Sequence, residues 1–153
     1  MSVLSVCYAL AKHIGLPELG IIAATEAIRR AGVEPREIDN AVVGNVIPTR
    51  PRDMYLGRAI GIGAGLPDSS QGLTLNRLCG SGAQAIATAA HRVMVDRVPI
   101  MVAGGLESIS LVGREQRNTS HAKNEWLVEH KPSIYDSMLE TSEAVAERYQ
   151  ISR

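Results

Sequence analysis

The residues best suited to chemistry lie in one short segment, residues 74–83, which reads TLNRLCGSGA. The pattern predicts that a strand ends before Cys79 and that a helix begins at it. Amides in a first helical turn lack intrahelical partners, and the helix dipole places about half a positive charge there, which favours a thiolate over a thiol. Gly80 and Gly82 are expected to leave the sulfur accessible and to permit backbone angles that side chains forbid. These features predict a nucleophilic cysteine on a rigid element.

Other interpretations of the same residues stay open at this point. A lone cysteine is often a small core hydrophobe, and this is favoured for Cys7 because nothing near it would activate a thiol, whereas Cys79 fits either role. Residues 80–85 (GSGAQA) also resemble a dinucleotide-binding fingerprint whose amides hold a pyrophosphate, with Glu107 just beyond the next strand. The late acid and the unexplained cysteine weaken that nicotinamide-dinucleotide interpretation. A carboxylate at Glu107 more often caps a turn.

Helices and strands are expected to alternate around this segment. This order is typical of βαβ units, and it predicts an α/β fold with a parallel sheet and helices on both faces. The alanine-rich helix after Cys79 is apolar on most faces, so it is expected to be buried between layers. The expected helices cover residues 17–31, 56–62 and 80–96, and the expected strands cover residues 41–47, 72–76 and 100–103, the last being stopped by Gly104 and Gly105.

The character of the sequence changes after Leu111. Residues 112–136 are polar and show no sustained period, which predicts a long functional or docking loop. A last helix is expected over residues 140–149. The sequence therefore predicts two parts, an α/β part over residues 1–111 and a loop region that begins over residues 112–153.

Composition excludes several classes of protein. The chain has 153 residues and a mass of 16.4 kDa, room for about one domain, with 16 basic and 16 acidic residues and only 3% aromatic residues. Neither a nucleic-acid partner nor an anionic membrane surface fits this balance. The apolar stretch at residues 3–11 has no basic residue before it, so it does not fit a signal peptide, and no apolar run is long enough to span a membrane. Two cysteines indicate a reducing compartment, and we expect a cytoplasmic protein.

Five motifs together resemble the thiolases, the acetyl-CoA acyltransferase family. The segment NRLCGSG at residues 76–82 is similar to the family's acyl-enzyme cysteine motif, and VAGGLESIS at residues 102–110 is similar to its second signature. The resemblance covers about residues 9–153, and the ketoacyl synthases, which share the fold, have different surroundings for their cysteine. The other three motifs are ELG at residues 18–20, GNV at residues 44–46 and SMLETSEAVAERY at residues 137–149.

The resemblance implies a layered thiolase-like fold, with a parallel-dominated mixed sheet, a slim buried helix after Cys79 and the start of a CoA-binding loop region over residues 112–153. It implies Claisen condensation or thiolytic cleavage of 3-ketoacyl-CoA through an acyl-Cys79 thioester. Acyl-CoA and CoA would be the substrates, with no metal or redox cofactor, and the family forms homo-oligomers. Met138 would border the acyl or pantetheine pocket, or pack as an ordinary methionine. Many short-chain members have histidine where this chain has Ser137, so acyl chain length stays open.

The sequence also departs from the family. The thiolases have a second half, which supplies a Gly-His-Pro histidine, a further cysteine that acts as acid and base, and an Asn-Glu-Ala segment. None of these occurs in this sequence. The opening strand with its Arg-Thr-Pro is also missing. We therefore expect a part of the amino-terminal half, truncated at both ends and without turnover by itself. The alternative is a non-catalytic half-domain that binds a full-length thiolase subunit.

Overall fold

The computed structural model describes residues 14–112 and 122–152, which belong to two compact units divided between Glu115 and Gln116. Each unit is described by itself. The motif assigned to Cys79 lies in the first unit, while Cys7 lies outside the described residues. No helix in the described ranges combines the length and apolarity needed to cross a membrane.

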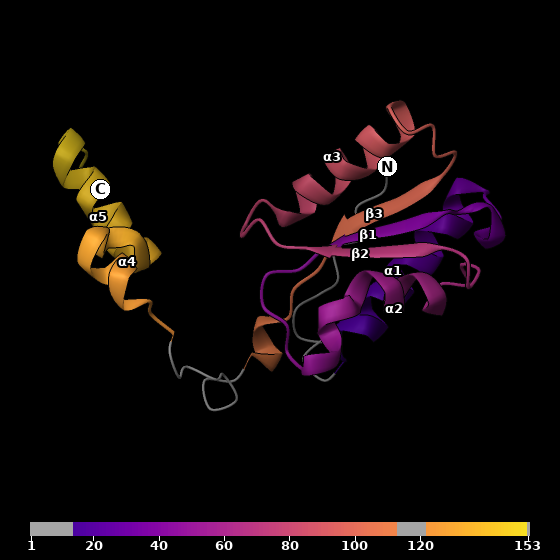
Figure 1. Ribbon diagram of the computed structural model, residues 1–153, viewed down its shortest axis with the longest axis horizontal. Coiled ribbons are helices and arrows are strands. Elements are labelled where there is room, and N and C mark those ends of the chain that lie inside the picture. The colour runs from indigo at the N-terminus through magenta and orange to yellow at the C-terminus, as the bar shows by residue number, and fades with distance from the viewer. Residues whose placement is uncertain (1–13, 113–121, 153) are drawn as a thin grey trace. The chain divides into compact units, whose positions relative to one another are not determined.

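Three parallel strands form the sheet of the first unit, in the order β2-β1-β3 (Figure 1). In the register of these strands, Gly44 at the end of β1 lies beside Leu75 of β2 and Gly105 of β3. The carboxyl ends of all three strands therefore meet at one edge of the sheet. This confirms the predicted parallel α/β arrangement. The strands are β1 (Asn40–Gly44), β2 (Gln71–Leu75) and β3 (Met101–Gly105).

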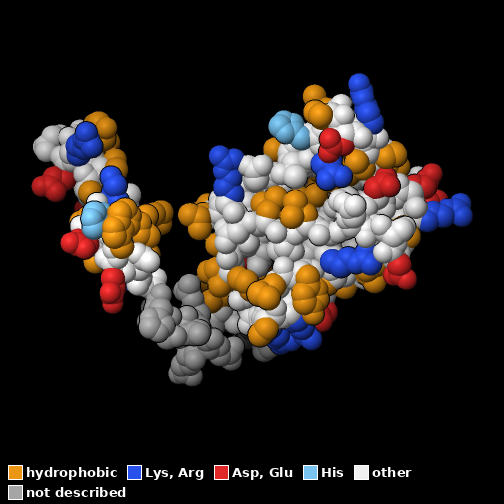
Figure 2. Space-filling view, viewed as in Figure 1, with side chains coloured by type: hydrophobic (Ala, Val, Ile, Leu, Met, Phe, Trp, Pro, Cys, Tyr) orange, Lys and Arg blue, Asp and Glu red, His pale blue; other side chains and the backbone are white. Residues whose placement is uncertain are grey.

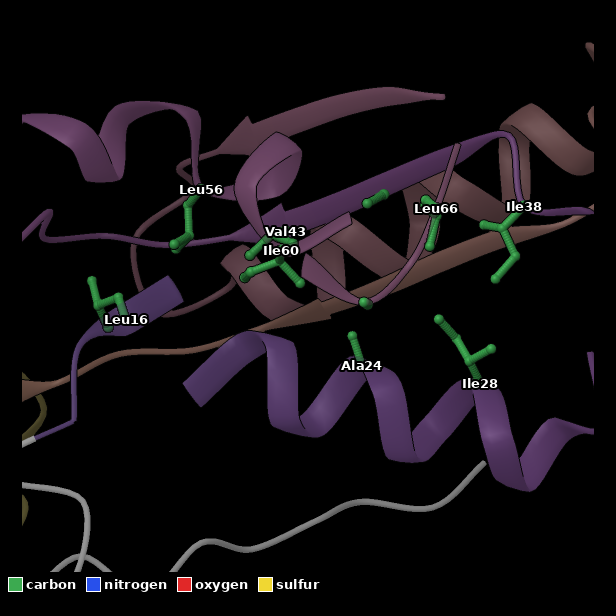
Figure 3. Packing of buried hydrophobic residues seen from close by; sticks show 10 residues of the cluster. Leu16, Ala24, Ile28, Ile38, Val43, Leu56, Ile60 and Leu66 are labelled. Carbon is green, nitrogen blue, oxygen red and sulfur yellow. The ribbon is translucent and has the colours of Figure 1, made fainter. Parts of the chain in front are cut away.

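Helices cover both faces of this sheet, as Figure 1 shows, with α1 and α2 on one face and α3 on the other. Because side chains alternate along a strand, Ala41 and Val43 of β1 pack with α1 and α2, whereas Val42 packs with α3. The main core lies on the α1 and α2 face (Figure 3). The helices are α1 (Leu16–Ala31), α2 (Leu56–Gly63) and α3 (Ser81–Met94), with 3₁₀-helices at Pro35–Glu37, Pro51–Tyr55 and Ile109–Leu111.

Capping signals in the sequence explain where α1 begins and ends. Pro17 and Glu18 stand in the first turn, where the amides are free and the dipole favours an acid. Gly32 follows the last turn with φ of 65° and donates its amide to the carbonyl oxygen of Arg29. A glycine adopts this left-handed conformation without steric cost, so the predicted stop of this helix is confirmed.

The alanine-rich helix α3 packs against the sheet through small residues. Ala85 is fully buried and Ala89 is 8% exposed, and both face Val42. Away from this contact, Ile86 is 43% exposed and Met94 is 67% exposed, and Figure 2 shows apolar side chains at the surface over this helix. The expected burial of α3 is therefore met on the face toward the sheet, and the other face is open to solvent in the first unit.

Two strand ends differ from the prediction. The strand expected over residues 41–47 ends at Gly44, and β3 continues through Gly104 and Gly105 instead of stopping before them. The reason is packing: a Cβ on Gly105 would lie 3.0 Å from the Cα of Gly82 in α3. The prediction that the glycines stop this strand is therefore wrong, because Gly105 belongs to β3 and is the position where the backbone of α3 approaches the sheet.

The second unit is helical. The sequence predicts a loop over residues 112–136. For the described part of this range the prediction is wrong, because it contains α4 and a 3₁₀-helix. The cause is local capping, since the side chain of Asn124 accepts a hydrogen bond from the amide of Leu127. The predicted last helix is confirmed and starts earlier than expected. The elements are α4 (Glu125–His130), the 3₁₀-helix Pro132–Tyr135 and α5 (Met138–Tyr149).

We expect Gly44→Ala to destabilise the chain, because its Cβ would lie 2.6 Å from the backbone carbonyl atoms of Ser81. Overpacking of this kind lowers the free energy of unfolding by about 1–3 kcal/mol. The matched control is Gly104→Ala, whose Cβ would meet nothing within 4 Å and which should change stability by less than about 1 kcal/mol. Urea unfolding measures both, and equal losses in the two variants would contradict the close approach of α3.

Candidate functional site

The candidate site lies at the edge of the sheet where the three strands end. Cys79 follows β2, Asn45 and Val46 follow β1, and Glu107 follows β3. In open parallel α/β sheets, ligands bind at this carboxyl edge. The fold therefore brings three of the sequence motifs, separated along the chain, to one edge.

Cys79 lies in the tight turn between β2 and α3, and it is exposed. Its sulfur is free, as a nucleophile requires. The helix begins at Ser81 with Gly80 as its cap, so Cys79 precedes the cap and does not open the helix itself. The amides of Gly80 and Ser81 donate to the carbonyl oxygens of Arg77 and Leu78, at 3.1 and 2.9 Å. These two amides close the turn, in contrast to the expectation that the first amides are all free.

The predicted backbone role of the glycines in this turn is also corrected, whereas their predicted role in keeping the sulfur accessible stays a prediction. Gly80 has φ of −85° and ψ of 2°, angles that other residues adopt, and a Cβ on Gly82 would meet nothing within 4 Å. Neither position needs glycine for its backbone conformation or for space in this unit. The residue with positive φ is Leu78, at 48°. No residue-type signal in the sequence points to a leucine at such a position, because glycine or asparagine is usual there.

Glu107 joins the loops after β1 and β3. Its two carboxylate oxygens accept hydrogen bonds from the amides of Val46 and Ile47, at 2.8 and 3.1 Å, and from Nδ2 of Asn45 at 3.0 Å. This agrees with the interpretation that Glu107 caps a turn. It also leaves the carboxylate occupied, and so unsuited to bind a nucleotide ribose.

Two asparagines support this edge, and the sequence offers them only as parts of the motifs at residues 44–46 and 76–82. Asn45 is 5% exposed, and its Nδ2 also donates to the carbonyl oxygen of Leu106. Asn76 accepts the amide of Leu78 with Oδ1, at 2.8 Å, and donates Nδ2 to the carbonyl oxygen of Val46, at 3.1 Å. The signal that could have found Asn76 is its type and spacing, because asparagine commonly accepts the amide two residues further on in a turn.

Met138 lies in the second unit, at the first position of α5, and it is 74% exposed. The preceding Ser137 caps α5, accepting the amide of Glu140 at 3.2 Å, and the Ser137 amide in turn holds the pKa of the Glu140 carboxyl below its ordinary value. The predicted contact of Met138 with an acyl or pantetheine group stays a prediction, as does the assignment of residues 112–153 to a CoA-binding loop region.

No group of three or more His, Cys, Asp or Glu side chains within residues 14–112 and 122–152 is placed to hold a metal ion. The prediction that the reaction needs no metal or redox cofactor is a separate matter and stays a prediction.

The comparisons with known proteins decide the family. Residues 5–153 match the family model described as "Thiolase, N-terminal domain". The chain belongs to the thiolase family. It is 38% identical to the beta-ketothiolase BktB of Cupriavidus necator over 93% of its length, and 31% identical to the human mitochondrial 3-ketoacyl-CoA thiolase over 94% of its length.

Solved thiolase structures have the same fold. The human mitochondrial 3-ketoacyl-CoA thiolase in complex with CoA matches 95% of the chain, with a TM-score of 0.76 and 28% identity. The Bacillus anthracis acetyl-CoA acetyltransferase matches 93%, with a TM-score of 0.73 and 32% identity. The chain covers 40% and 38% of those two structures and 38% and 39% of the two relatives above, so it corresponds to about two-fifths of a thiolase. These matches give no support to a nicotinamide-dinucleotide site.

We expect Glu107→Gln to weaken the edge of the sheet, because the amide nitrogen that replaces one carboxylate oxygen cannot accept a hydrogen bond from the backbone. Leaving such groups unpaired lowers the free energy of unfolding by about 1–3 kcal/mol. The matched control is Glu129→Gln, a side chain that is 79% exposed, with an expected change below about 0.5 kcal/mol. Urea unfolding of both variants tests this, and an unchanged Glu107→Gln variant would show that the hydrogen bonds of Glu107 do not hold the loops together.

Proposed function

We propose that this chain is the nucleophile-bearing part of an acyl-CoA acyltransferase of the thiolase type, and that Cys79 is its acyl-accepting residue. One observation carries the proposal: an exposed, free cysteine stands in the turn between β2 and α3, inside a motif that resembles the acyl-enzyme motif of the family to which the chain belongs. Its place at the carboxyl edge of the sheet, beside the loops that follow β1 and β3, supports the same role.

The proposed reaction has two steps that share one intermediate. The thiolate of Cys79 attacks the carbonyl carbon of an acyl-CoA, the bond from that carbon to the sulfur of CoA breaks, and CoA leaves as its thiolate. In condensation, the carbanion formed from acetyl-CoA by loss of a proton then attacks the acyl-Cys79 thioester and releases the Cys79 thiolate. Thiolytic cleavage of a 3-ketoacyl-CoA is the reverse sequence. Holding the acyl group on the enzyme lets the second substrate enter after the first product leaves.

Acyl-CoA thioesters and CoA are the proposed substrates. The names of the relatives support this class, since they are thiolases and acetyl-CoA acetyltransferases, and one similar structure is described in complex with CoA. We further propose that Met138 borders the acyl or pantetheine group, that the protein acts as a homo-oligomer, and that it resides in the cytoplasm. Ser137, which caps α5, leaves the acyl chain length open.

The remaining catalytic groups are proposed to come from the thiolase part that the 153 residues do not include. The family resemblance implies a histidine that activates the nucleophile, and a positioned general base contributes about 10²–10⁴ in rate. It also implies an asparagine that helps to hold the oxyanion, and removing one such donor lowers the rate by about 10²–10³. We therefore propose that these 153 residues bear the nucleophile without completing the catalytic cycle.

We expect Cys79 to be modified in preference to Cys7. The folded chain is treated at neutral pH with iodoacetamide, or in a parallel reaction with acetyl-CoA, and peptide mass spectrometry locates the adducts. A Cys79→Ser variant should lose the preferred adduct, and the control variant Cys7→Ser should keep it. Equal and slow modification of both cysteines would contradict the nucleophile assignment and would favour the non-catalytic half-domain.

We expect no steady-state cleavage of acetoacetyl-CoA by the purified 153-residue chain, because the proposed base and oxyanion asparagine are not part of it. The loss of acetoacetyl-CoA absorbance on addition of CoA measures the rate, and the Cys79→Ser variant sets the background. Sustained cleavage above that background would contradict the proposed division of the catalytic groups.

A further inference from the structure

Leu78, the residue before Cys79, has a backbone conformation that needs an explanation. Its φ of 48° lies in the left-handed region, which is disfavoured about five- to thirtyfold for a residue with a side chain. The leucine side chain is 69% exposed, so burial does not stabilise this conformation. Strained residues of this kind concentrate at functional sites, where the surrounding structure holds them.

Hydrogen bonds hold both backbone polar groups of Leu78. Its amide donates to Oδ1 of Asn76 at 2.8 Å. Its carbonyl oxygen accepts from the hydroxyl of Ser81 at 2.6 Å and from the Ser81 amide at 2.9 Å. We name this arrangement the Leu78 clamp, formed by Asn76 on one side and Ser81 on the other.

The Leu78 clamp is anchored to the rest of the unit at both ends. Nδ2 of Asn76 donates to the carbonyl oxygen of Val46, whose own amide donates to Glu107. Ser81 is 5% exposed, and its hydroxyl also accepts the amide of Arg77 at 2.8 Å. The turn is therefore tied to the loops after β1 and β3 on one side and to the first turn of α3 on the other.

We infer that Asn76 and Ser81 are positioning residues for Cys79. They hold Leu78 in the left-handed conformation, and this conformation fixes the direction in which the chain enters Cys79 and so where the sulfur lies at the edge of the sheet. The inference rests on the proposed function, because the position of the sulfur matters for catalysis only if Cys79 is the nucleophile. Both residues act through Leu78 and need not contact the substrate.

The test compares the rate of iodoacetamide alkylation at Cys79 in variants of the folded chain. Asn76→Ala removes the acceptor for the Leu78 amide, so the left-handed conformation loses population, and we expect alkylation about fivefold slower. Leu78→Gly in the same background makes that conformation free of steric cost, and we expect it to restore most of the rate. The rates are measured as a function of pH, with the Cys7 rate in the same reaction as the reference.

The matched control is Asn124→Ala, which removes a comparable asparagine acceptor, that of the Leu127 amide, in the second unit. It should leave the Cys79 rate unchanged. A residue that only stabilises the fold would lower the unfolding midpoint without changing the alkylation rate of the folded chain. Hydrogen exchange gives a second measurement, since the Leu78 amide should lose protection in Asn76→Ala.

Each outcome separates this inference from the proposed function. Fast alkylation of Cys79 with no effect of Asn76→Ala would overturn the Leu78 clamp. It would leave the assignment of Cys79 as the nucleophile unaffected. A slow variant that Leu78→Gly fails to restore, or a double variant that does not fold, would also overturn the clamp, because glycine should remove the need for it. If the unsubstituted chain shows no preference for Cys79 over Cys7, the proposed function fails first.

Discussion

The close approach of α3 to the ends of β1 and β3 is the contact on which the site depends. At this edge, Gly44 lies against Ser81, and Gly105 lies against Gly82, so backbone meets backbone without an intervening side chain. Because the first turn of α3 is held there, the start of the helix is fixed relative to the sheet. The turn from β2 into α3 is short, so the position of Cys79 follows from that contact.

Much of this arrangement could be predicted from the sequence, because its signals are local or periodic. The alternation of helices and strands gave the parallel sheet, and Gly32 gave the end of α1. The glycines of β3 were misinterpreted because a glycine looks the same whether it stops a strand or admits a neighbouring helix. Only the residue packed against the glycine, here Gly82 of α3, distinguishes these two roles. The sequence pattern within a single segment does not reveal that residue.

The site itself was also predicted only in part, because contacts between segments do not show in a local sequence pattern. The motif around Cys79 predicts the nucleophile candidate, but it places the unusual backbone angles at Gly80 and Gly82, whereas the left-handed residue is Leu78. The Leu78 amide donates to Asn76 and the Leu78 carbonyl oxygen accepts from Ser81, and we infer that these hydrogen bonds, rather than an intrinsic preference, hold that conformation. Residues 112–136 show the same limitation, since the cap that Asn124 provides starts a helix in a segment without hydrophobic periodicity.

These contacts make a rigid turn the central feature of the site, with a free cysteine held in the turn before α3. The most direct measurement is the ratio of the Cys79 alkylation rate in the folded chain to its rate in the same chain unfolded in urea. We expect a ratio above one, because a nucleophile role for Cys79 would require the fold to activate the sulfur. A ratio of one or less would show that the turn merely contains a cysteine, and it would contradict the assignment of Cys79 as the nucleophile.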